Sequence, residues 1–463
     1  MTREKKIITY SSMIISFVLI FIYCLSPFAI GLNHAGNNTS FETAVGLKGA
    51  NDGYFYTGYS ILPDAAKING SMYSVIRPLV ALCDIFSDYF DIRVLSFIYL
   101  ILLLISVFYL NKYINFGNKT LDIIFALLVV FVVFDLSYLV YLNTLYAEGM
   151  FYVLFVFEVS LYIKLINSNK PQLPTSIVFC LVALILCGLK ANLLFIIIPL
   201  LLMTGYLIYK RKSLVYRIIV GILSLLFVIY PVLNYSDYLN EDTDKFHSIF
   251  YGILYENKNP AKTLYKLNID KNYISLAGKN QFDKLDIDVS SEEFRKNVLN
   301  KVSYSDVFRY YLSNPSEYAK QFKYVGWNAF ETYPKYAGNY SSSNGKGAYD
   351  VAGGFKIYNL IKSKLFPKTL WFVYLIPLLL IGILLAYRKI FNKGYLVLGV
   401  SLSLMNIILF NVPMITSGLV DISRTMAIYN VTFDSIFIMI ISCMLYISAK
   451  RKQEFKEKYG LTQ

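Results

Sequence analysis

The sequence has few charged side chains. Only 16% of its 463 residues are Asp, Glu, Lys or Arg, whereas soluble globular proteins carry about 25%. This shortage excludes an ordinary soluble domain over most of the chain. Tryptophan is also scarce, with 2 residues against 41 tyrosines. Because tyrosine is common both at bilayer interfaces and at polar binding surfaces, the aromatic content does not separate an enzyme from a transporter.

Cysteine is equally rare, and the sequence contains no Cys-x-x-Cys pair. We therefore predict neither a disulfide framework nor a zinc site. The five cysteines lie in or beside apolar runs, at Cys24, Cys83, Cys180, Cys187 and Cys443.

Motifs of soluble enzymes are missing as well. The chain has no P-loop, GxGxxG, HExxH or GxSxG pattern, which are the signatures of nucleotide sites, metalloproteases and serine hydrolases. The connections expected on the cytoplasmic side are too short for a nucleotide-binding domain. Both observations argue against a mechanism driven from the inside by ATP or a nucleotide sugar.

What the chain does contain is a series of long apolar runs. Hydrophobic residues make up 56% of it, and roughly 20 apolar residues are enough to span a bilayer as a helix. We predict an all-α integral membrane protein with about ten transmembrane helices. The first run is too long for a signal-peptide core, so we interpret it as an uncleaved span. The expected spans are 8–30, 92–113, 121–140, 150–166, 175–189, 193–209, 214–230, 370–387, 395–410 and 427–447.

The basic residues indicate how these helices are oriented. The net charge is +14, and the positive side chains gather in both tails and in alternate short connections, while the remaining short connections hold only Lys190 and Arg424. Cytoplasmic loops are enriched in Lys and Arg. We therefore predict a multi-pass cell-membrane protein with both termini in the cytoplasm. On this interpretation the charge orients the chain in the lipid bilayer and does not indicate a nucleic-acid partner.

Two long segments are expected on the extracytoplasmic side. The first, 31–91, belongs to an N-terminal transmembrane domain of residues 1–233, and its part 75–90 reads as an amphipathic helix lying along the membrane. The second, 234–368, is a soluble and mostly helical insert of domain size. Residues 369–463 would form the C-terminal transmembrane helices and a basic cytoplasmic tail.

Isolated charges at the ends of apolar runs suggest an active site on the extracytoplasmic side. Glu148, Lys190 and Arg424 all fall at the outer ends of spans, where a charge is costly unless it has a function. Glu148 could act as a general base, and the two cations could hold a phosphate. Each residue also has a purely structural alternative. Glu148 could be a solvated carboxylate in a turn, Lys190 could extend its ammonium to the membrane interface, and Arg424 could form an ion pair with Asp421. The aromatic and polar neighbours of Glu148 are further candidates for substrate binding: Tyr141, Asn143 and Tyr146.

Three other polar residues are candidates with stronger structural alternatives. Asp52 and Glu42 lie in the first long loop, but Asp52 precedes a glycine, which is a common turn signal. His247 begins the large insert and could serve as an acid, a base or a phosphate donor, although a lone histidine is more often structural. The acids inside spans are expected to make interhelical hydrogen bonds: Asp135, Glu158 and Asp434.

Several dispersed motifs together resemble one known group of proteins. The matching pieces are Tyr141-x-Asn143-x-x-Tyr146-x-Glu148, the junction 188–192, the segments 246–254, 259–260 and 276–278, and the last-span residues Arg424, Asn430 and Asp434. They resemble the GT-C-type polytopic glycosyltransferases, in particular the bacterial glycan-biosynthesis hexose transferase (WsfD-like) family. One departure concerns the Gly-Asp-Phe-like element expected soon after the first span. That stretch ends here in Phe41-Glu42, so Glu42 or Asp52 would replace the family's acid, or the first loop carries none.

The resemblance implies a membrane glycosyltransferase. Such an enzyme would move a hexose from a polyprenyl-phosphate donor to a cell-envelope glycan on the outer face, with Glu148, Asp52 or Glu42 as the catalytic carboxylate. Lys190 and Arg424 would stabilise the phosphate leaving group. No cofactor is certain, and a divalent metal is possible. The alternatives are an envelope polysaccharide polymerase or ligase and a flippase of lipid-linked sugars. The sugar, the acceptor, the stereochemistry and the oligomeric state stay open.

Overall fold

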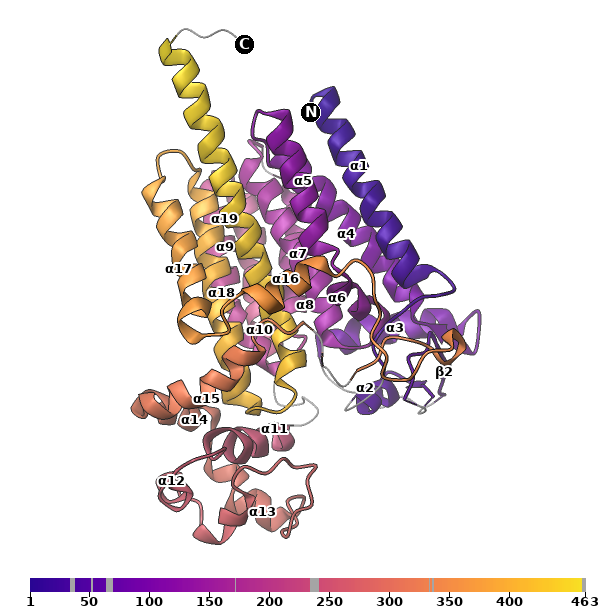
Figure 1. Cartoon of the computed structure of the whole chain (residues 1–463), viewed down its shortest axis with the longest axis vertical. Coiled ribbons are helices and arrows are strands. Elements are labelled where there is room, and N and C mark those ends of the chain that lie inside the picture. The colour runs from indigo at the N-terminus through magenta and orange to yellow at the C-terminus, as the bar shows by residue number, and fades with distance from the viewer. Residues whose placement is uncertain are drawn as a thin grey trace.

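The computed structural model describes residues 1–33, 38–50, 53–63, 70–170, 172–233, 241–332, 334 and 337–459. Long helices form a bundle, and both chain ends lie at one end of it (Figure 1). We call this the terminal end. A smaller packed body hangs from the opposite end, which we call the insert end. The predicted all-α membrane fold is confirmed, since the described strands form only one small sheet.

The first half of the bundle is built from helices that cross it in alternating directions. α1 runs into a π-helical turn, η1, and α5 is followed by two short helices, α6 and η2, before α7 begins. The bounds are α1 Arg3–Ile20, η1 Phe21–Leu25, α4 Arg93–Tyr113, α5 Lys119–Val133, α6 Leu136–Leu139, η2 Val140–Asn143, α7 Ala147–Asn167 and α8 Leu173–Cys187.

The second half completes the bundle around α7, which is the most deeply buried of the long helices. α18 packs against both α17 and α19. The bounds are η3 Ala191–Ile196, α9 Ile197–Lys210, α10 Leu214–Leu233, α17 Leu370–Ala386, α18 Lys393–Ser417 and α19 Ile422–Tyr459.

The number of membrane spans differs slightly from the prediction. Among the described residues, 7 helices are long and apolar enough to cross a membrane, or up to 9 if each of two bent helix pairs counts as one span. About ten were expected, and the remaining run is the short helix α8. One bend, of 46°, follows α5, where the Asp135 carboxylate accepts a hydrogen bond from Ser137 N and caps α6 instead of continuing α5. The chain is thus a multi-pass membrane protein.

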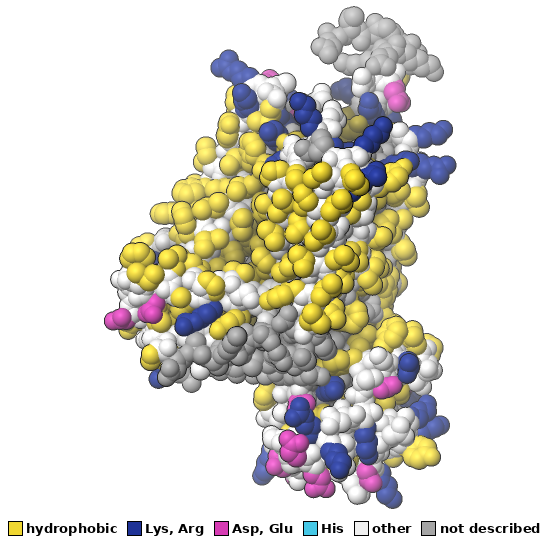
Figure 2. All heavy atoms as spheres, turned by 180° about the vertical axis from the view of Figure 1, so that it is seen from behind, with side chains coloured by type: hydrophobic (Ala, Val, Ile, Leu, Met, Phe, Trp, Pro, Cys, Tyr) yellow, Lys and Arg dark blue, Asp and Glu magenta, His cyan; other side chains and the backbone are white. Residues whose placement is uncertain are grey.

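The surface agrees with this placement in lipid. Hydrophobic side chains cover the middle of the bundle, while Lys and Arg gather at the terminal end (Figure 2). The body at the insert end carries interspersed acidic and basic side chains instead. A broad apolar belt is the surface that a bilayer requires. Which end faces the cytoplasm remains a prediction from the basic residues.

The first long loop forms a small layer at the insert end. β1 Leu47–Lys48 and β3 Tyr89–Asp91 both pair antiparallel with β2 Gly58–Ile61, in the order β1-β2-β3. The loop also contains α2, Asn38–Ala44, and α3, Ser71–Asp84. The expected amphipathic helix therefore starts and ends earlier than predicted. Beyond α3, Ile85, Phe86 and Tyr89 remain exposed, as a segment touching the membrane surface would require.

The body at the insert end, which we call the insert, comprises residues 241–332. Phe246, Phe250 and Phe294 form its aromatic core. Local signals define two of its helices, because Ser303 and Asp306 make a capping box and Pro315 occupies the first turn of α15. Its elements are α11 Glu241–Ser248, η5 Ile249–Ile253, α12 Pro260–Lys266, η6 Lys271–Leu276, α13 Glu292–Asn297, η7 Leu299–Lys301, α14 Tyr304–Ser313 and α15 Pro315–Asn328.

The segment 337–368 lies on the helical bundle, although the sequence suggested that it belongs to the insert. It contains η8, Ser342–Asn344, and α16, Ile357–Leu365, and α16 lies across the bundle beside α19 (Figure 1). Leu136 N donates to Phe355 O at 2.7 Å, and Asn359 N donates to the Asp135 carboxylate at 3.1 Å. The helix pair α16 and α17 is bent by 117°. The predicted domain limits otherwise stay a prediction.

Candidate functional site

Glu148 lies in the first turn of α7, at the insert end of the bundle. Its side chain is only 1% exposed. The preceding helix η2 folds back over this turn, so that an added Cβ on Gly149 would come within 2.4 Å of Tyr141 O. Only glycine permits this approach. Gly149 therefore fixes where the Glu148 carboxylate points.

Lys190 approaches Glu148 from the junction between α8 and η3. The Lys190 ammonium lies 2.5 Å from Glu148 Oε1. The first loop supports this junction, because Ser71 N, at the start of α3, donates to Gly188 O at 3.0 Å. An added Cβ on Gly188 would meet Ser71 Oγ at 2.0 Å. A glycine two residues before Lys190 thus allows α3 to fix the junction.

Arg424 completes the cluster from the first turn of α19. Its Nε atom lies 3.7 Å from Glu148 Oε1 and 2.7 Å from Asp421 Oδ2. The guanidinium carbon lies 5.0 Å from the centroid of the Tyr146 ring, in a cation–π arrangement. Asp421 has a φ of 48°, a conformation that Asp tolerates better than most residues. The Arg424–Asp421 pair considered from the sequence is therefore present, together with the contact to Glu148.

Within this charged cluster, the two cations are more exposed to solvent than the Glu148 carboxylate beneath them. The side chains of Lys190 and Arg424 are 28% and 18% exposed, against 1% for Glu148. Burial and neighbouring Asp421 and Glu148 raise the pKa of Tyr146 to about 12, although Arg424 lowers it. Tyr146 therefore keeps its proton at neutral pH. An anion arriving from the insert end meets the cations first, and it can compete with Glu148 for them.

The first-loop acid Glu42 is linked to this cluster indirectly, through Tyr59. It is 3% exposed, and it raises the pKa of Tyr59, which burial already places well above its ordinary value. Tyr59 also interacts electrostatically with Tyr146, the residue under Arg424. Tyr59 was not anticipated from the sequence, in which it is one of 41 tyrosines. The other first-loop candidate, Asp52, lies outside the described residues.

Tyr141 and Asn143, predicted to bind substrate, have structural partners. The Tyr141 hydroxyl donates to Thr332 O at 3.0 Å. The Asn143 amide donates to Cys24 O and Ile30 O at 3.0 and 2.8 Å, and its oxygen accepts from Ser96 Oγ at 2.6 Å. These bonds join η2 to the end of the first helix and to α4. Both side chains therefore tie η2 to neighbouring segments, and their role in substrate binding stays a prediction.

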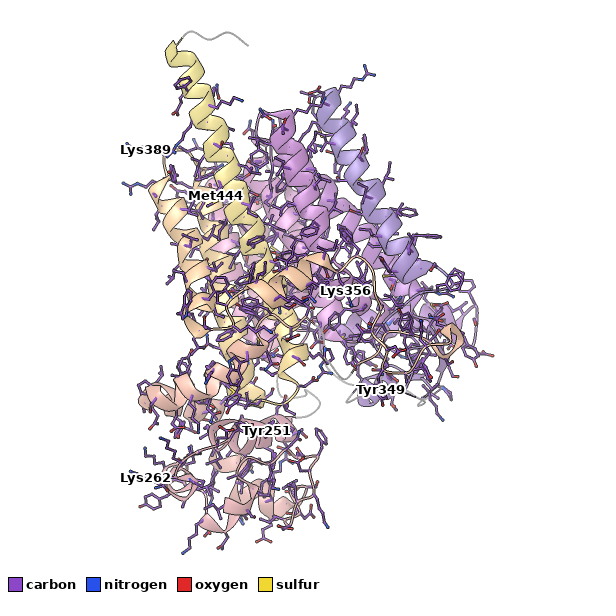
Figure 3. The ribbon with its side chains drawn as sticks, in the orientation of Figure 1. Tyr251, Lys262, Tyr349, Lys356, Lys389 and Met444 are labelled. Atoms are coloured by element: carbon purple, nitrogen blue, oxygen red, sulfur yellow. The ribbon has the colours of Figure 1, made fainter. Side chains whose placement is uncertain are left out.

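His247 was a third substrate-binding candidate, and its side chain lies in the insert. The ring is buried, and its Nε2 atom accepts a hydrogen bond from Gln281 N at 3.1 Å. Phe246 and Phe282 flank the ring. Burial lowers the pKa of His247 below its ordinary value of 6.5, although Asn280 and Asp283 oppose this shift. The neighbouring Tyr251 marks where the insert meets the bundle (Figure 3), and its carbonyl accepts from Leu419 N at 3.1 Å.

A second charged cluster, fully enclosed, lies deeper in the bundle. Lys362 of α16 reaches Asp434 of α19, with Nζ 2.8 Å from Oδ2 and 3.0 Å from Oδ1. Tyr138 and Tyr358 donate their hydroxyls to the two oxygens of the same carboxylate. The interhelical bonds expected of Asp434 and Asp135 are thus present. Lys362 was not anticipated from the sequence, because it lies near other lysines and resembles a solvated residue.

The remaining intramembrane acid behaves differently. Glu158 in α7 is buried, and neither of its carboxylate oxygens has a hydrogen-bond partner within the described ranges. The interhelical hydrogen bond expected for this residue is therefore not formed there. No group of three or more His, Cys, Asp or Glu that could hold a metal ion occurs in the part of the chain that the structure describes.

Comparison with known proteins gives one match. The model of a family described as the YfdI N-terminal transmembrane domain matches residues 2–461. No curated protein and no solved structure matches the chain. Because the family model covers nearly all of the sequence, the chain belongs to the YfdI N-terminal transmembrane domain family, a family of membrane proteins of glycosyltransferase-like type.

Proposed function

We propose that this protein is a membrane hexosyltransferase of the WsfD-like kind, and that the Glu148–Lys190–Arg424 cluster is its active site. One observation carries the proposal: a buried carboxylate lies directly beneath two partly exposed cations, 2.5 and 3.7 Å away. Three segments far apart in the chain supply these groups. Sugar transfer from a lipid phosphate needs a carboxylate that can accept a proton and cations that can hold the phosphate. This cluster contains both.

The donor in this proposal is a hexose linked to polyprenyl phosphate. Its phosphate would displace Glu148 from Lys190 and lie against Lys190 and Arg424. The acceptor hydroxyl then attacks the anomeric carbon, and the bond from that carbon to the phosphate oxygen breaks. The electron pair leaves with the phosphate, where the two cations stabilise the charge. The acceptor proton passes to Glu148, which is now free to accept it.

The surroundings of the cluster fit a lipid donor and a polar acceptor. The cluster lies at the end of the apolar belt, next to the insert and the small sheet of the first loop. A polyprenyl chain can stay in the bilayer there while its phosphate reaches the cations. On the orientation predicted from the basic residues, this end is extracytoplasmic, and the acceptor is a cell-envelope glycan. Glu42 is the second candidate carboxylate, because it interacts with Tyr59, which also interacts with Tyr146.

The decisive experiment compares envelope glycans from cells that carry the gene, lack it, or express a variant. Mass spectrometry should show loss of one hexose-sized group from an otherwise intact glycan when the gene is deleted, and in Glu148→Gln and Lys190→Met. Lys119→Gln is the control, because it removes an exposed lysine at the terminal end, where it pairs with Glu4 at 3.0 Å. Immunoblots of membranes confirm equal expression.

Two outcomes would reject the proposal. Unchanged glycan in Glu148→Gln and Lys190→Met would remove the cluster from the reaction. Loss or shortening of the whole polymer, with lipid-linked repeat units accumulating, would identify a polymerase, ligase or flippase instead.

A further inference from the structure

A cavity of about 430 Å³ lies between α5, α7, α18 and α19, in the half of the bundle nearest the terminal end. This volume falls in the range of small-molecule sites, roughly 300–1,000 Å³. Its walls are mostly apolar, and Val159, Ile438 and Met439 are among them. On α19 the wall residues recur at helical spacing, from Ser435 to Tyr446. One continuous stripe of α19 therefore faces the cavity.

The mouth of the cavity is polar and lies at the terminal end. Asn115, Asn167 and Asn392 line it and are all exposed. The Asn167 amide donates to Tyr395 OH at 2.8 Å, and Asn392 Oδ1 accepts from Tyr206 OH at 3.0 Å. Asn115 and Asn392 lie in connections between long helices, and Asn167 is the last residue of α7. The cavity thus opens where the bundle reaches the membrane surface.

Four lysines flank wall residues of the cavity in the sequence. Each one immediately precedes or follows a residue that lines the cavity, and three of the four are exposed. The four are Lys112, Lys164, Lys389 and Lys393. Lys389, labelled in Figure 3, lies at the terminal end above the membrane belt. The nearby acids Asp122 and Glu4 are already paired, with Lys5 and Lys119. The charge around the mouth is therefore complementary to an anion.

We propose that this cavity binds an acyl chain of an anionic phospholipid from the leaflet at the terminal end, with the lipid phosphate held by the lysines that flank the wall residues. An apolar void of this size at membrane depth forfeits packing contacts if it stays empty, and the adjacent bilayer supplies hydrocarbon chains. Lysines near an anionic leaflet attract such headgroups. A free anion would use the lysines but not the apolar interior, and a neutral lipid would use the interior but not the lysines.

This site is separate from the cluster around Glu148. The deepest wall residue on α7 is Val156, eight residues along the helix from Glu148, or about 12 Å. The cavity opens toward the opposite end of the bundle from that cluster. The inference therefore does not rest on the proposed transferase activity, and it holds if the reaction is a different one.

The test is native mass spectrometry of the purified, delipidated protein, titrated with phosphatidylglycerol, phosphatidylcholine or a polyprenyl phosphate. Val159→Phe and Ser442→Phe should each fill the cavity and weaken phosphatidylglycerol binding at least about tenfold. Met444→Phe is the matched control, because Met444 is on the same helix (Figure 3), is 56% exposed and does not line the cavity.

A second pair of variants leaves the packing intact and tests the mouth. Lys112→Gln with Lys393→Gln should weaken phosphatidylglycerol binding, whereas Lys450→Gln with Lys452→Gln, farther along α19, should not. Equal binding in the filled variants and in Met444→Phe would overturn the proposal. So would equal affinity for phosphatidylcholine and phosphatidylglycerol, or a filled-cavity effect seen only with the polyprenyl phosphate.

Discussion

The bundle contains two clusters in which a lysine meets a carboxylate, and they differ in their access to the outside. In the Glu148 cluster, Lys190 is 28% exposed and its acid 1%. In the deeper cluster, Lys362 is 0% exposed and Asp434 4%. Two tyrosine hydroxyls also donate to the Asp434 carboxylate. In the Glu148 cluster the partly exposed Lys190 is accessible to a ligand. In the deeper cluster Lys362 and two tyrosines surround the Asp434 carboxylate and are enclosed by the bundle.

This difference in exposure suggests a binding role for the Glu148 cluster and a structural role for the Lys362–Asp434 cluster. A buried ion pair costs a large desolvation energy, and that cost is met only when the remaining hydrogen-bonding atoms are satisfied. Around Asp434 they are, because both oxygens accept from Lys362 and from a tyrosine. Glu148 Oε2 makes no hydrogen bond within the described residues. We infer that Lys362–Asp434 holds α16 onto α19, while the Glu148 cluster is kept ready for a substrate.

The largest effect should come from breaking the enclosed pair. Lys362→Met leaves Asp434 charged and buried without its cation, which costs about 3–5 kcal/mol. Thermal unfolding in detergent, followed by circular dichroism, should show a large loss of stability. The double variant Lys362→Met with Asp434→Asn should recover much of it. A wild-type unfolding curve for the single variant would end the distinction between the two clusters.

A smaller effect is expected from crowding the open cluster from below. Gly149→Ala would place a methyl group 2.4 Å from Tyr141 O, and relieving such overpacking costs about 1–3 kcal/mol. The first turn of α7 must shift, and a displacement of about 1 Å at a catalytic group can cost about 100-fold in rate. The glycan assay and thermal unfolding together check this. Gly205→Ala is the control, because nothing lies within 4 Å of an added Cβ there.

A third buried ionisable group, His247, extends the comparison to the insert. It is held neutral by burial, with its pKa below the ordinary 6.5. The unfolded chain binds a proton more readily than the folded insert does, so stability falls as the pH drops through about 6.5. Protection factors of the insert amides, which correct exchange rates for their intrinsic slowing in acid, should fall between pH 7.5 and 5.5 (approximate test conditions). His247→Asn should lessen this pH dependence, and unchanged dependence would contradict the assignment.

The smallest effect should come from an exposed pair. Lys119 and Glu4 are each 59% exposed and lie 3.0 Å apart. Glu4→Gln should change stability by only about 0–1 kcal/mol, because water screens exposed pairs. Thermal unfolding checks this against Lys362→Met in the same detergent. A loss approaching that of Lys362→Met would show that exposure does not govern the strength of these pairs.

Much of the fold followed from local patterns. The apolar runs coincide with helices. Ser291 and Pro315, residue types that favour helix starts, lie at the beginnings of α13 and α15. Long-range packing was harder to predict from the sequence. The segment after Gly338 contacts the first loop through Asn339, whose amide donates to Gly31 O at 2.9 Å.

The site could be predicted in part. Glu148, Lys190 and Arg424 stood out because a lone charge at the end of an apolar run is costly, and the structure brings all three into contact. Their orientation could not be predicted, since it depends on Gly149 and Gly188, whose lack of a side chain matters only once the neighbouring segment is known. Lys362 was missed because its partner, Asp434, lies 72 residues away.

The cluster also implies an order of events during biosynthesis. Glu148 and Lys190 leave the ribosome well before Arg424, which is carried by α19. A nascent chain that has inserted α7 and α8 therefore holds the acid and one cation but lacks the second cation and the Tyr146–Arg424 stack. If the cluster is catalytic, a chain interrupted before α19 is inert. Completion of membrane insertion, with α19 in place, then assembles the full cluster.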